Sequence, residues 1–369
     1  MTIGLITYHA SHNYGSMLQT YALQTLLETY NFEPTVINLR LPQQKAFYNT
    51  CYNSNEIGLK NFVRKILYLP YKKDMLNQYK IFETFLRTNF NLSREEYISE
   101  KELSTSDLNF DYWICGSDQI WNLECLDFDW SYFLSFVKSG KKIAYAPSFG
   151  PCMNDSIKRE CKKIKKMVRS LDAISVREKG SMDIVYSLTG IKPSLVADPT
   201  WLLPVLKWNK CAGDKPIVDG DYIFLYVPRY VKETYKIASL LSKKLNMKVV
   251  VSNLVNWKVI YDSFQKELNT GPFEFLNLIR NASLVCSGSF HAVVFAILFN
   301  TPFWVVNGDL DNRISNILDL FGFQDRSISL DIFDKKVGKS MEMDFSAIDE
   351  ILEKYKKISL DYLLKALDK

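Results

Sequence analysis

Residues 283–306 read SLVCSGSFHAVVFAILFNTPFWVV, and this stretch decides the fold class. A short apolar run at 283–286 leads into a turn of small residues, a longer apolar segment, and a second apolar run at 302–306. Continuous apolar strands are typical of parallel sheets that helices cover on both faces. The stretch therefore predicts a strand, a helix and a second strand, which is the repeating unit of an α/β protein.

The same alternation of apolar runs and helical patterns extends along the 369 residues. Further strands are predicted at 3–8, 35–39, 112–115, 142–146, 173–176, 193–197, 222–227 and 248–251. Apolar residues at helical spacing are found at 17–30, 154–169, 232–245, 272–281 and 311–321. Strands that alternate with helices favour parallel, doubly wound sheets, here in two Rossmann-like domains that face each other across a cleft.

The boundary between the two domains is predicted within residues 201–220, which are rich in Pro, Gly and Asp and lack a clear period. We predict an N-terminal Rossmann-like domain at 1–205 and a C-terminal one at 206–344. Residues 345–369 place apolar side chains on one face and predict an amphipathic helix that docks back on the protein. The cleft between such domains is the default ligand site.

Composition narrows the class of protein. Apolar residues make up 47% and charged residues 24%, and a net charge of +5 is too mild to indicate a nucleic-acid binder. The seven cysteines form no CxxC pair, so we expect neither a disulfide framework nor a thiolate zinc site. No apolar stretch approaches the ~20 residues of a membrane-spanning helix, so we expect a cytoplasmic protein.

The turn at 287–289 is the strongest candidate for chemistry. Ser287, Gly288 and Ser289 present hydroxyls and backbone N–H groups to an anion at the start of a predicted helix. His291 follows in the first helical turn, and an imidazole changes its charge near neutral pH. We interpret His291 as a general acid. The alternative is a capped helix in which the imidazole meets a backbone carbonyl.

The first predicted strand ends in another polar turn, HASHNYGSM, which begins at His9. Gly15 lets the backbone approach a ligand closely, Asn13 lies just before it, and Ser16 is a candidate helix N-cap. For His9 and His12 we favour the interpretation of ordinary polar turn residues. A zinc site built from the three histidines requires two distant turns to converge, and we predict no metal.

Three further apolar runs end in polar groups. Arg177 and Glu178 follow AISV, Ser117 and Asp118 follow YWIC, and Asp198 follows SLVA. An arginine fork suits a carboxylate or a phosphate. Because the carboxyl ends of parallel strands meet at one edge of a sheet, these turns predict one side of a cleft.

Other features are weaker. Asp127 and Asp129 have the DxD form of a metal-nucleotide site, a match that also arises often by chance. Residues 158–169 are rich in Lys and Arg, which favours a solvated helix face; the alternative is contact with an anionic membrane surface or a lipid pyrophosphate. Aromatic residues that suit either sugar stacking or packing are Tyr48, Tyr52, Trp130 and Trp257.

Several stretches of the chain together resemble the polysaccharide pyruvyl transferase family. They are NYGSMLQTYALQ (13–24), DYWICGSDQIWN (111–122), KKIAYAPSFG (141–150), SVRE (175–178), VADPT (196–200), SGSFHAVVFAILFNTPF (287–303) and NRISNIL (312–318). The resemblance implies a fold of the glycosyltransferase-B (GT-B) type and transfer of pyruvate from phosphoenolpyruvate to hydroxyls of a glycan, as in capsule or exopolysaccharide biosynthesis. The family histidine falls on His291 and the family arginine on Arg177. Ala292 stands where the family usually has glycine.

The resemblance and the chemistry of phosphoenolpyruvate together assign roles to the candidate residues. The donor carries a carboxylate and a phosphate, so its site needs cations and helix-start N–H groups. We expect His291 to donate a proton and Arg177 to hold the anionic end of the donor. The other donor-binding candidates, on the C-terminal domain, are Ser287, Gly288, Ser289, Arg229 and Arg313. The acceptor-binding candidates, on the N-terminal domain, are Asn13, Gly15, Ser16, Ser117 and Asp118.

The expected partners are phosphoenolpyruvate and a glycan acceptor, with a polyprenyl-pyrophosphate-linked sugar as one candidate; we expect no cofactor and no metal. A peripheral contact through 158–169 would place the protein at the inner face of the plasma membrane. Two other interpretations stay open. One is a GT-B glycosyltransferase with a nucleotide-sugar donor, for which Glu274 and Asp309 are candidate ribose ligands. The other is a glycan-binding protein without catalysis.

Overall fold

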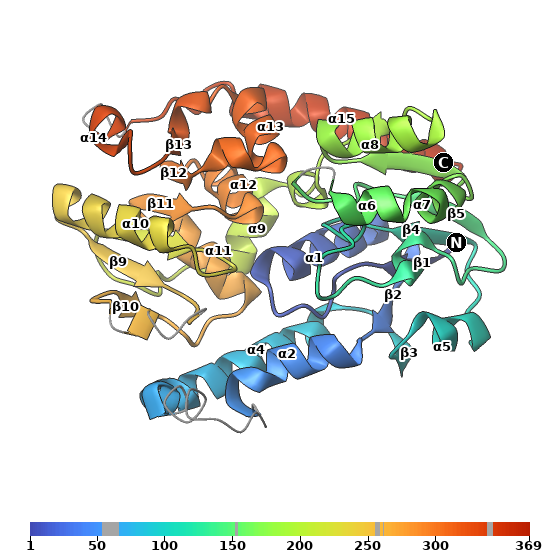
Figure 1. Cartoon of the computed structure of the whole chain (residues 1–369), viewed down its shortest axis with the longest axis horizontal. Helices are drawn as coiled ribbons and strands as arrows, with labels where there is room; N and C mark the ends of the chain where they lie inside the picture. Colours follow the sequence, from blue (N-terminus) through green and yellow to red (C-terminus); the bar gives the residue numbers. More distant parts are fainter. Residues whose placement is uncertain (54–65, 152–153, 255–258, 261, 338–341) are drawn as a thin grey trace.

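The computed structural model describes residues 1–53, 66–151, 154–254, 259–260, 262–337 and 342–369. Within these residues the chain forms two parallel sheets with helices packed around them (Figure 1). The predicted α/β class with two Rossmann-like domains is confirmed. Trp257 and the side chain of Tyr52, two of the aromatic candidates, lie outside the described part of the chain.

The N-terminal sheet has seven strands in the order β3-β2-β1-β4-β5-β6-β7, each parallel to its neighbours. They are β1 (Thr2–Ile6), β2 (Glu33–Leu39), β3 (Leu92–Tyr97), β4 (Tyr112–Cys115), β5 (Lys141–Ala144), β6 (Ala173–Val176) and β7 (Ser194–Leu195). The prediction missed β3, whose sequence is LSREEY. This strand lies at the edge of the sheet and exposes its central residues, so it lacks the apolar run that identified the others.

The C-terminal sheet has six parallel strands in the order β10-β9-β8-β11-β12-β13. They are β8 (Tyr222–Tyr226), β9 (Lys248–Val251), β10 (Gln265–Lys266), β11 (Leu284–Ser287), β12 (Phe303–Val306) and β13 (Ser327–Ile328). Every residue of β8, β11 and β12 is buried, as their continuous apolar runs predict.

Both sheets reverse their strand order at the same relative position, beside their first strand. The reversal falls between β1 and β4 in the N-terminal sheet and between β8 and β11 in the C-terminal sheet. Ligands of doubly wound sheets bind outside the carboxyl ends of the strands at this switch point. The four loops that follow β1, β4, β8 and β11 are therefore the expected place for a site.

Helices connect the strands, and those predicted at 17–30, 232–245, 272–281 and 311–321 are found; the helices at 42–53, 72–89, 100–105, 179–189, 205–212 and 333–336 were not predicted. They are α1 (Tyr14–Thr29), α2 (Pro42–Asn53), α4 (Lys72–Asn89), α5 (Glu100–Thr105), α6 (Asp155–Arg159), α7 (Cys161–Val168), α8 (Lys179–Thr189), α9 (Val205–Ala212), α10 (Lys232–Leu245), α11 (Pro272–Arg280), α12 (Phe290–Leu298), α13 (Asn312–Phe321), α14 (Phe333–Lys336) and α15 (Ile348–Ala366). The single helix predicted at 154–169 is two helices, α6 and α7, which meet at Glu160.

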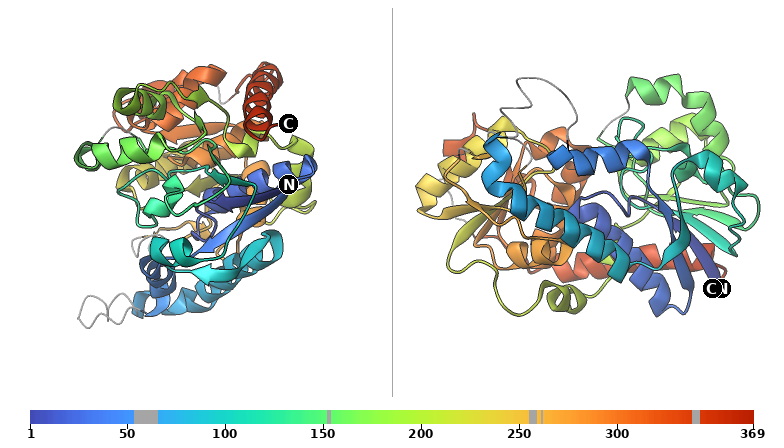
Figure 2. Two further views of the ribbon diagram at one scale, coloured as in Figure 1. Left: turned by 90° about the vertical axis from the view of Figure 1, so that its right-hand side faces the viewer. Right: turned by 90° about the horizontal axis from the view of Figure 1, so that it is seen from below.

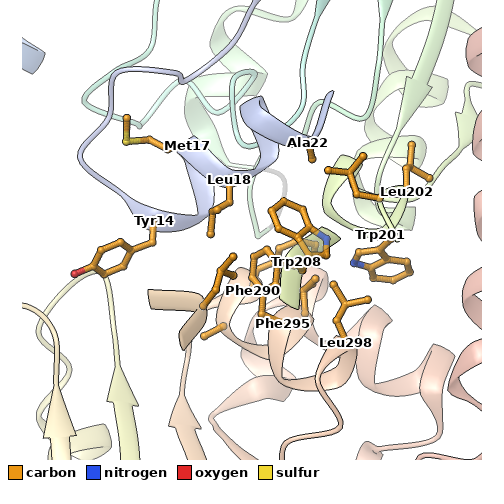
Figure 3. Packing of buried hydrophobic residues seen from close by; sticks show 14 of the residues in the cluster. Tyr14, Met17, Leu18, Ala22, Trp201, Leu202, Trp208, Phe290, Phe295 and Leu298 are labelled. Carbon is orange, nitrogen blue, oxygen red and sulfur yellow. The ribbon is translucent and has the colours of Figure 1, made fainter. Parts of the chain in front are cut away.

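Aromatic and aliphatic side chains join the two domains. Tyr14 and Leu18 of α1 belong to the same buried cluster as Phe290 and Phe295 of α12 (Figure 3). The Trp208 side chain of α9 packs edge-on against Phe295, with ring centroids 5.1 Å apart. Burial of this apolar surface, at about 25 cal/mol per Å², holds the starts of α1 and α12 face to face.

The C-terminal helix α15 crosses back to the N-terminal sheet (Figure 1). The Ser359 hydroxyl accepts a hydrogen bond from the backbone N–H of Ala197 at 2.8 Å, and the Tyr362 hydroxyl donates to the Ala144 carbonyl at 2.9 Å. Both ends of the chain consequently lie at the same end of the N-terminal domain (Figure 2). The predicted docking of this helix is confirmed.

Candidate functional site

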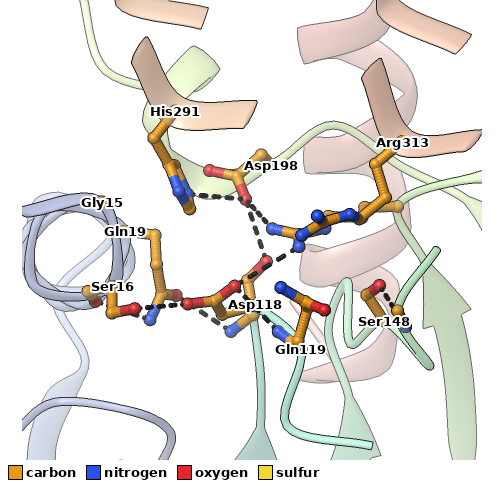
Figure 4. Close-up of polar contacts among 12 residues, drawn as sticks. Gly15, Ser16, Gln19, Asp118, Gln119, Ser148, Asp198, His291 and Arg313 are labelled. Atoms are coloured by element: carbon orange, nitrogen blue, oxygen red, sulfur yellow. Dashed lines mark hydrogen bonds and ion pairs between the residues drawn. The ribbon is translucent and has the colours of Figure 1, made fainter. Parts of the chain in front are cut away.

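The first turns of α1 and α12 meet at the domain interface. Gly15 lies in α1, and a Cβ atom added to it would be 2.2 Å from Nδ1 of His291 in α12 (Figure 4). This separation is far below any van der Waals contact, so only glycine fits at that position. The sequence predicted a close backbone approach at Gly15. What approaches it is the imidazole of the other domain.

His291 is nearly buried, with 8% of its side chain exposed. Its Nε2 lies 3.7 Å from Oδ2 of Asp198, which is an ion-pair separation and too long for a hydrogen bond. Among the residues that the structure describes, Nε2 has no hydrogen-bond partner. The alternative in which the imidazole meets a backbone carbonyl through this nitrogen is therefore not observed. The ion pair with Asp198 thus leaves the hydrogen-bonding capacity of Nε2 unused.

Asp198 connects His291 to Arg177. Burial would raise the pKa of the Asp198 carboxyl, but the neighbouring imidazole and guanidinium bring it well below its ordinary value. The side chain is fully buried and also accepts hydrogen bonds from Ser117 Oγ at 3.1 Å and Thr200 Oγ1 at 2.7 Å. A fixed, ionised carboxylate therefore faces the histidine.

Arg177 is surrounded by carboxylates. Its three nitrogens lie 3.1 Å from Asp198, 3.3 Å from Asp118 and 3.3 Å from Glu178, and its guanidinium stacks at 4.4 Å on the Phe290 ring. Only 1% of the side chain is exposed. Burial raises the pKa of Glu178, whose carboxylate also accepts a hydrogen bond from Ser181. Arg177 thus holds three acidic groups together across the carboxyl ends of β4, β6 and β7.

Asp118 links this cluster to α1. Its Oδ2 accepts a hydrogen bond of 2.6 Å from Ser16 Oγ, and its Oδ1 contacts Arg177. Burial opposes ionisation of Asp118, but Arg177 and His291 bring its pKa below the ordinary value. The backbone N–H of Ser117 donates to Oε1 of Gln19 at 3.0 Å, which fixes the turn against α1. The predicted acceptor-side residues Gly15, Ser16, Ser117 and Asp118 are brought together here.

One local prediction about the first turn is wrong. The N-cap of α1 is Asn13, whose Oδ1 accepts from the N–H groups of Gly15 at 3.0 Å and Ser16 at 3.3 Å. Ser16 instead lies in the first helical turn and uses its hydroxyl on Asp118. The cap occupies these two N–H groups, so they are not open to an anion.

The turn after β11 retains an open helix start. Ser287 Oγ donates to the Tyr226 carbonyl at 2.5 Å and accepts from the N–H of Ser289 at 3.0 Å, so its hydroxyl is used within the domain. Helix α12 has no side-chain cap, and Gly288 is partly exposed. The first N–H groups of α12 remain as anion donors.

The two additional arginines differ in environment. Arg313 is paired with Asp311 through Nε–Oδ1 at 2.9 Å and Nη2–Oδ2 at 2.5 Å. It lines a cavity of about 60 Å³ together with Arg177 and Asp198. Arg229, after β8, is exposed and has no hydrogen bond or ion pair within the described part of the chain. Burial raises the pKa of the Cys125 thiol in the N-terminal domain, and the charge of Arg229 opposes this rise. Arg229 therefore faces the domain interface.

The other two histidines are structural. His9 is buried with Nε2 3.2 Å from Asn38 Oδ1, and burial lowers its pKa to about 4. His12 contacts Glu83 at 2.9 Å and stacks on Phe82 with ring centroids 5.0 Å apart. Within the described ranges, no group of three or more His, Cys, Asp or Glu side chains is arranged to hold a metal ion.

Asp198 was predicted to border the cleft without a specific role, and Gln19, within the stretch 13–24, was not a candidate site residue. The signal for Asp198 was its position after an apolar strand, which it shares with many turn residues. Nothing in the order of residues indicates that it pairs with both Arg177 and His291. Gln19 carried no signal at all, because a glutamine inside a helical pattern is ordinary.

Two Rossmann-like domains joined through a buried polar network define a protein of the GT-B type. The sequence profile of the polysaccharide pyruvyl transferase family matches residues 13–309. The chain belongs to this family. No curated protein sequence matches it significantly.

Solved structures share the fold at low sequence identity. The UDP-GlcNAc 2-epimerase of Methanocaldococcus jannaschii is similar with a TM-score of 0.52 and 12% identity, over 96% of this chain and 100% of the other. A putative UDP-N-acetylglucosamine 2-epimerase of Listeria monocytogenes has a TM-score of 0.51 and 11% identity, over 100% and 95%. The corresponding Rickettsia bellii enzyme has a TM-score of 0.50 and 9% identity, over 100% and 96%. These similarities establish the fold alone.

None of the described helices combines the length and the apolar character that crossing a bilayer requires.

Proposed function

We propose that the protein transfers the enolpyruvyl group of phosphoenolpyruvate to two hydroxyls of a sugar in a surface-polysaccharide precursor, forming a pyruvate ketal. The observation that carries the proposal is Nε2 of His291, which has no hydrogen bond within the described residues and lies 3.7 Å from the ionised Asp198, in the first turn of α12 at the domain interface. Membership of the family supplies the class of reaction.

The chemistry needs one group that first gives and then takes protons. His291 protonates the methylene carbon of phosphoenolpyruvate, which becomes a methyl group and leaves an oxocarbenium-like carbon. A sugar hydroxyl attacks this carbon, and its proton returns to the imidazole. Phosphate then leaves, and a second hydroxyl closes the ketal while its proton passes to phosphate. General acid–base catalysis of this kind contributes ~10²–10⁴-fold.

Asp198 and Arg177 support His291 in this proposal. The carboxylate at 3.7 Å stabilises the charged imidazolium, and Arg177 keeps that carboxylate ionised and in place. Since each nitrogen of Arg177 contacts a carboxylate, its proposed contact with the donor requires it to exchange one of these partners. We therefore assign Arg177 first as a positioning residue.

The donor anion is proposed to bind on the C-terminal domain. The uncapped N–H groups of α12, the hydroxyl of Ser289 and the guanidinium of Arg229 are the candidates for its phosphate and carboxylate. Arg313 shares its charge with Asp311 and is the weaker candidate. The cavity of about 60 Å³ beside Arg313 is lined by Arg177 and Asp198, whereas Ser289 and Arg229 do not line it.

Phosphate release from phosphoenolpyruvate in the presence of acceptor tests the proposal. His291→Ala should abolish release and Asp198→Asn should reduce it strongly, while both proteins keep a wild-type circular dichroism spectrum. Asp331→Asn, which changes an exposed carboxylate, is the matched control and should release phosphate normally. Unchanged release by the His291→Ala protein would refute the assignment.

A nucleotide-sugar glycosyltransferase is the rival enzyme. The solved structures of similar fold include epimerases of UDP-GlcNAc. The two candidate ribose ligands already accept hydrogen bonds within the chain. Glu274 Oε2 accepts from the N–H of Gly271 at 2.9 Å, and Asp309 accepts from the Ser327 hydroxyl. A thermal shift with phosphoenolpyruvate and none with UDP-sugars would separate the two donors.

The proposed contact with a membrane surface involves the basic helices α6 and α7. Ile157, Ile164 and Val168 are buried, which leaves the basic side chains of 158–169 exposed. Lys163 Nζ lies 3.6 Å above the Trp130 ring, so this basic face borders the loop after β4. We propose that it contacts anionic lipid or the pyrophosphate of a polyprenyl-linked acceptor at the inner face of the plasma membrane.

A further inference from the structure

A second polar cluster lies beside the His291 site on the N-terminal domain. It joins the loop after β1, helix α2 and the loop after β4. Ser11 Oγ donates a hydrogen bond to Oδ2 of Asp127, and the Tyr48 hydroxyl donates to the same oxygen at 3.3 Å. Gln44 Nε2 donates to Ser11 Oγ at 3.4 Å. Three segments that are distant in sequence thus converge on one carboxylate.

Two oxygens of this cluster lack partners. Oδ1 of Asp127 and Oε1 of Gln44 have no hydrogen bond within the described residues. Both residues are buried, with exposed fractions of only 6% for Asp127 and 2% for Gln44. The Tyr8 hydroxyl also lacks one and lies beside the weakly accepting thiol of Cys125. Buried polar atoms are normally paired, so the unpaired oxygens of Asp127 and Gln44 indicate a missing donor, whereas the Tyr8 hydroxyl has the Cys125 thiol beside it.

The chemistry of the unpaired atoms describes that partner. A carboxylate oxygen and an amide oxygen accept hydrogen bonds, so the partner must donate at two neighbouring positions. Burial raises the pKa of Asp127, and in its ionised form the carboxylate repels an anion. Adjacent hydroxyls of a sugar ring fit this pattern, because each donates to one acceptor. The phenol of Tyr8 can donate in turn to a hydroxyl or ring oxygen.

An aromatic surface borders the cluster. The ring of His12 stacks on Tyr48 with centroids 5.1 Å apart and an interplanar angle of 21°, and it also stacks on Phe82, so these two rings cover the imidazole and the Tyr48 ring is the one left to border the cluster. Sugar rings present C–H groups that pack on such faces. Paired acceptors beside the Tyr48 ring are the pattern of a carbohydrate subsite.

The cluster faces the proposed reaction centre. Burial raises the pKa of Tyr8, and the nearby charges of Asp127 and Asp118 raise it further. Burial likewise raises the pKa of Tyr48, and the Tyr226 hydroxyl of the C-terminal domain contributes to that rise. Asp118 in turn contacts Arg177, whose other partner Asp198 faces His291. The cluster and the histidine therefore border the same interface between the domains.

The DxD interpretation of this segment does not hold in the structure. Asp129 accepts from the backbone N–H of Ser131 at 2.9 Å and caps the short helix Trp130–Phe133. Its carboxylate therefore acts apart from Asp127, whose partners are Ser11 and Tyr48. A metal-bound nucleotide would need both carboxylates at one point.

We propose that Asp127, Gln44 and Tyr8 form the subsite for adjacent hydroxyls of the acceptor sugar, with the Tyr48 ring at its border. The subsite rests on the proposed function for its role in the reaction. It assigns acceptor recognition to residues other than Asn13, whose side chain is used as a helix cap.

Sugar binding without the donor tests this subsite. Saturation-transfer NMR is recorded on the full chain with the methyl glycosides of glucose, galactose, mannose and N-acetylglucosamine. At least one should bind, and Asp127→Asn and Gln44→Ala should each weaken it roughly tenfold or more. Asp129→Asn is the matched control in the same loop and should bind normally, since Asn and Asp cap helices equally well.

The outcomes separate the subsite from the reaction. Equal binding by the Asp127→Asn and wild-type proteins at equal thermal midpoints would overturn the subsite, as would the absence of any bound glycoside. Binding that disappears with EDTA would also overturn it, in favour of a cation site. The thermal shift with phosphoenolpyruvate should persist in Asp127→Asn. If the wild type shows no such shift but binds sugar through Asp127, the subsite stands and the pyruvyl donor fails.

Discussion

Gly15→Ala is the most direct test of the domain interface. A Cβ at this position would lie 2.2 Å from Nδ1 and 2.3 Å from Cγ of His291, so the atoms must separate by roughly 1 Å to reach van der Waals contact. Either α1 moves away from α12 or the imidazole leaves its rotamer. Overpacking of this kind costs about 1–3 kcal/mol. A displacement of ~1 Å at a reacting group lowers turnover by about 10²-fold.

Gly180→Ala is the matched control. Gly180 is also the second residue of its helix, α8, and also faces the other domain, but its added Cβ would lie 3.6 Å from Asn312, an ordinary contact. Without a clash, Gly→Ala in a helix stabilises by about 0.5–1 kcal/mol. We expect a lower thermal midpoint and slower phosphate release for Gly15→Ala, and an unchanged or higher midpoint for Gly180→Ala. Equal behaviour of the two variants would refute the interface contact.

Three further predictions concern charge. Arg177→Met leaves three buried carboxylates without their cation and should destabilise the protein by about 3–5 kcal/mol in denaturant unfolding, more than Arg177→Lys. Burial lowers the pKa of His9 from 6.5 to about 4. Between these pH values the imidazole is protonated in the unfolded chain but neutral in the folded protein. The thermal midpoint should therefore fall between pH 6.5 and 4, by the equivalent of about 3 kcal/mol, and His9→Asn should flatten this slope. Replacing Lys162, Lys165 and Lys166 by Gln should abolish flotation with phosphatidylglycerol vesicles without changing phosphate release in solution; equal flotation would exclude this face.

Most strands of the fold could be predicted because they carry buried apolar runs, but β3 and the two-residue strands β10 and β13 were not predicted. Their apolar runs are visible in β8, β11 and β12 without knowledge of their neighbours. Strand β3 could not be predicted, since it lies at an edge and has a polar sequence. The division of 154–169 into α6 and α7 was equally hidden, because both helices bury the same apolar face.

The candidate residues could be located on turns, but their partners could not be predicted. Arg177 meets carboxylates 59, 21 and 1 residues away in the chain, and the strand order of the sheet brings them together. The contact of Gly15 with His291 depends on how two domains pack, which no periodicity encodes. A positively charged site for an anion was expected around Arg177. The structure surrounds this cation with an excess of negative charge.

That excess of negative charge constrains how the proposed reaction is organised. Three carboxylates share one guanidinium on the N-terminal side of the interface, whereas the open helix start and Arg229 lie on the C-terminal side. A doubly anionic donor is therefore repelled from the first side and attracted to the second. Hydroxyl groups, which donate hydrogen bonds, are suited to the acidic side, where Asp127 has an unpaired oxygen. His291 belongs to the C-terminal side but lies against the acidic side, beside Asp198 and Gly15, so in the proposed reaction the proton donor stands where the two sides meet.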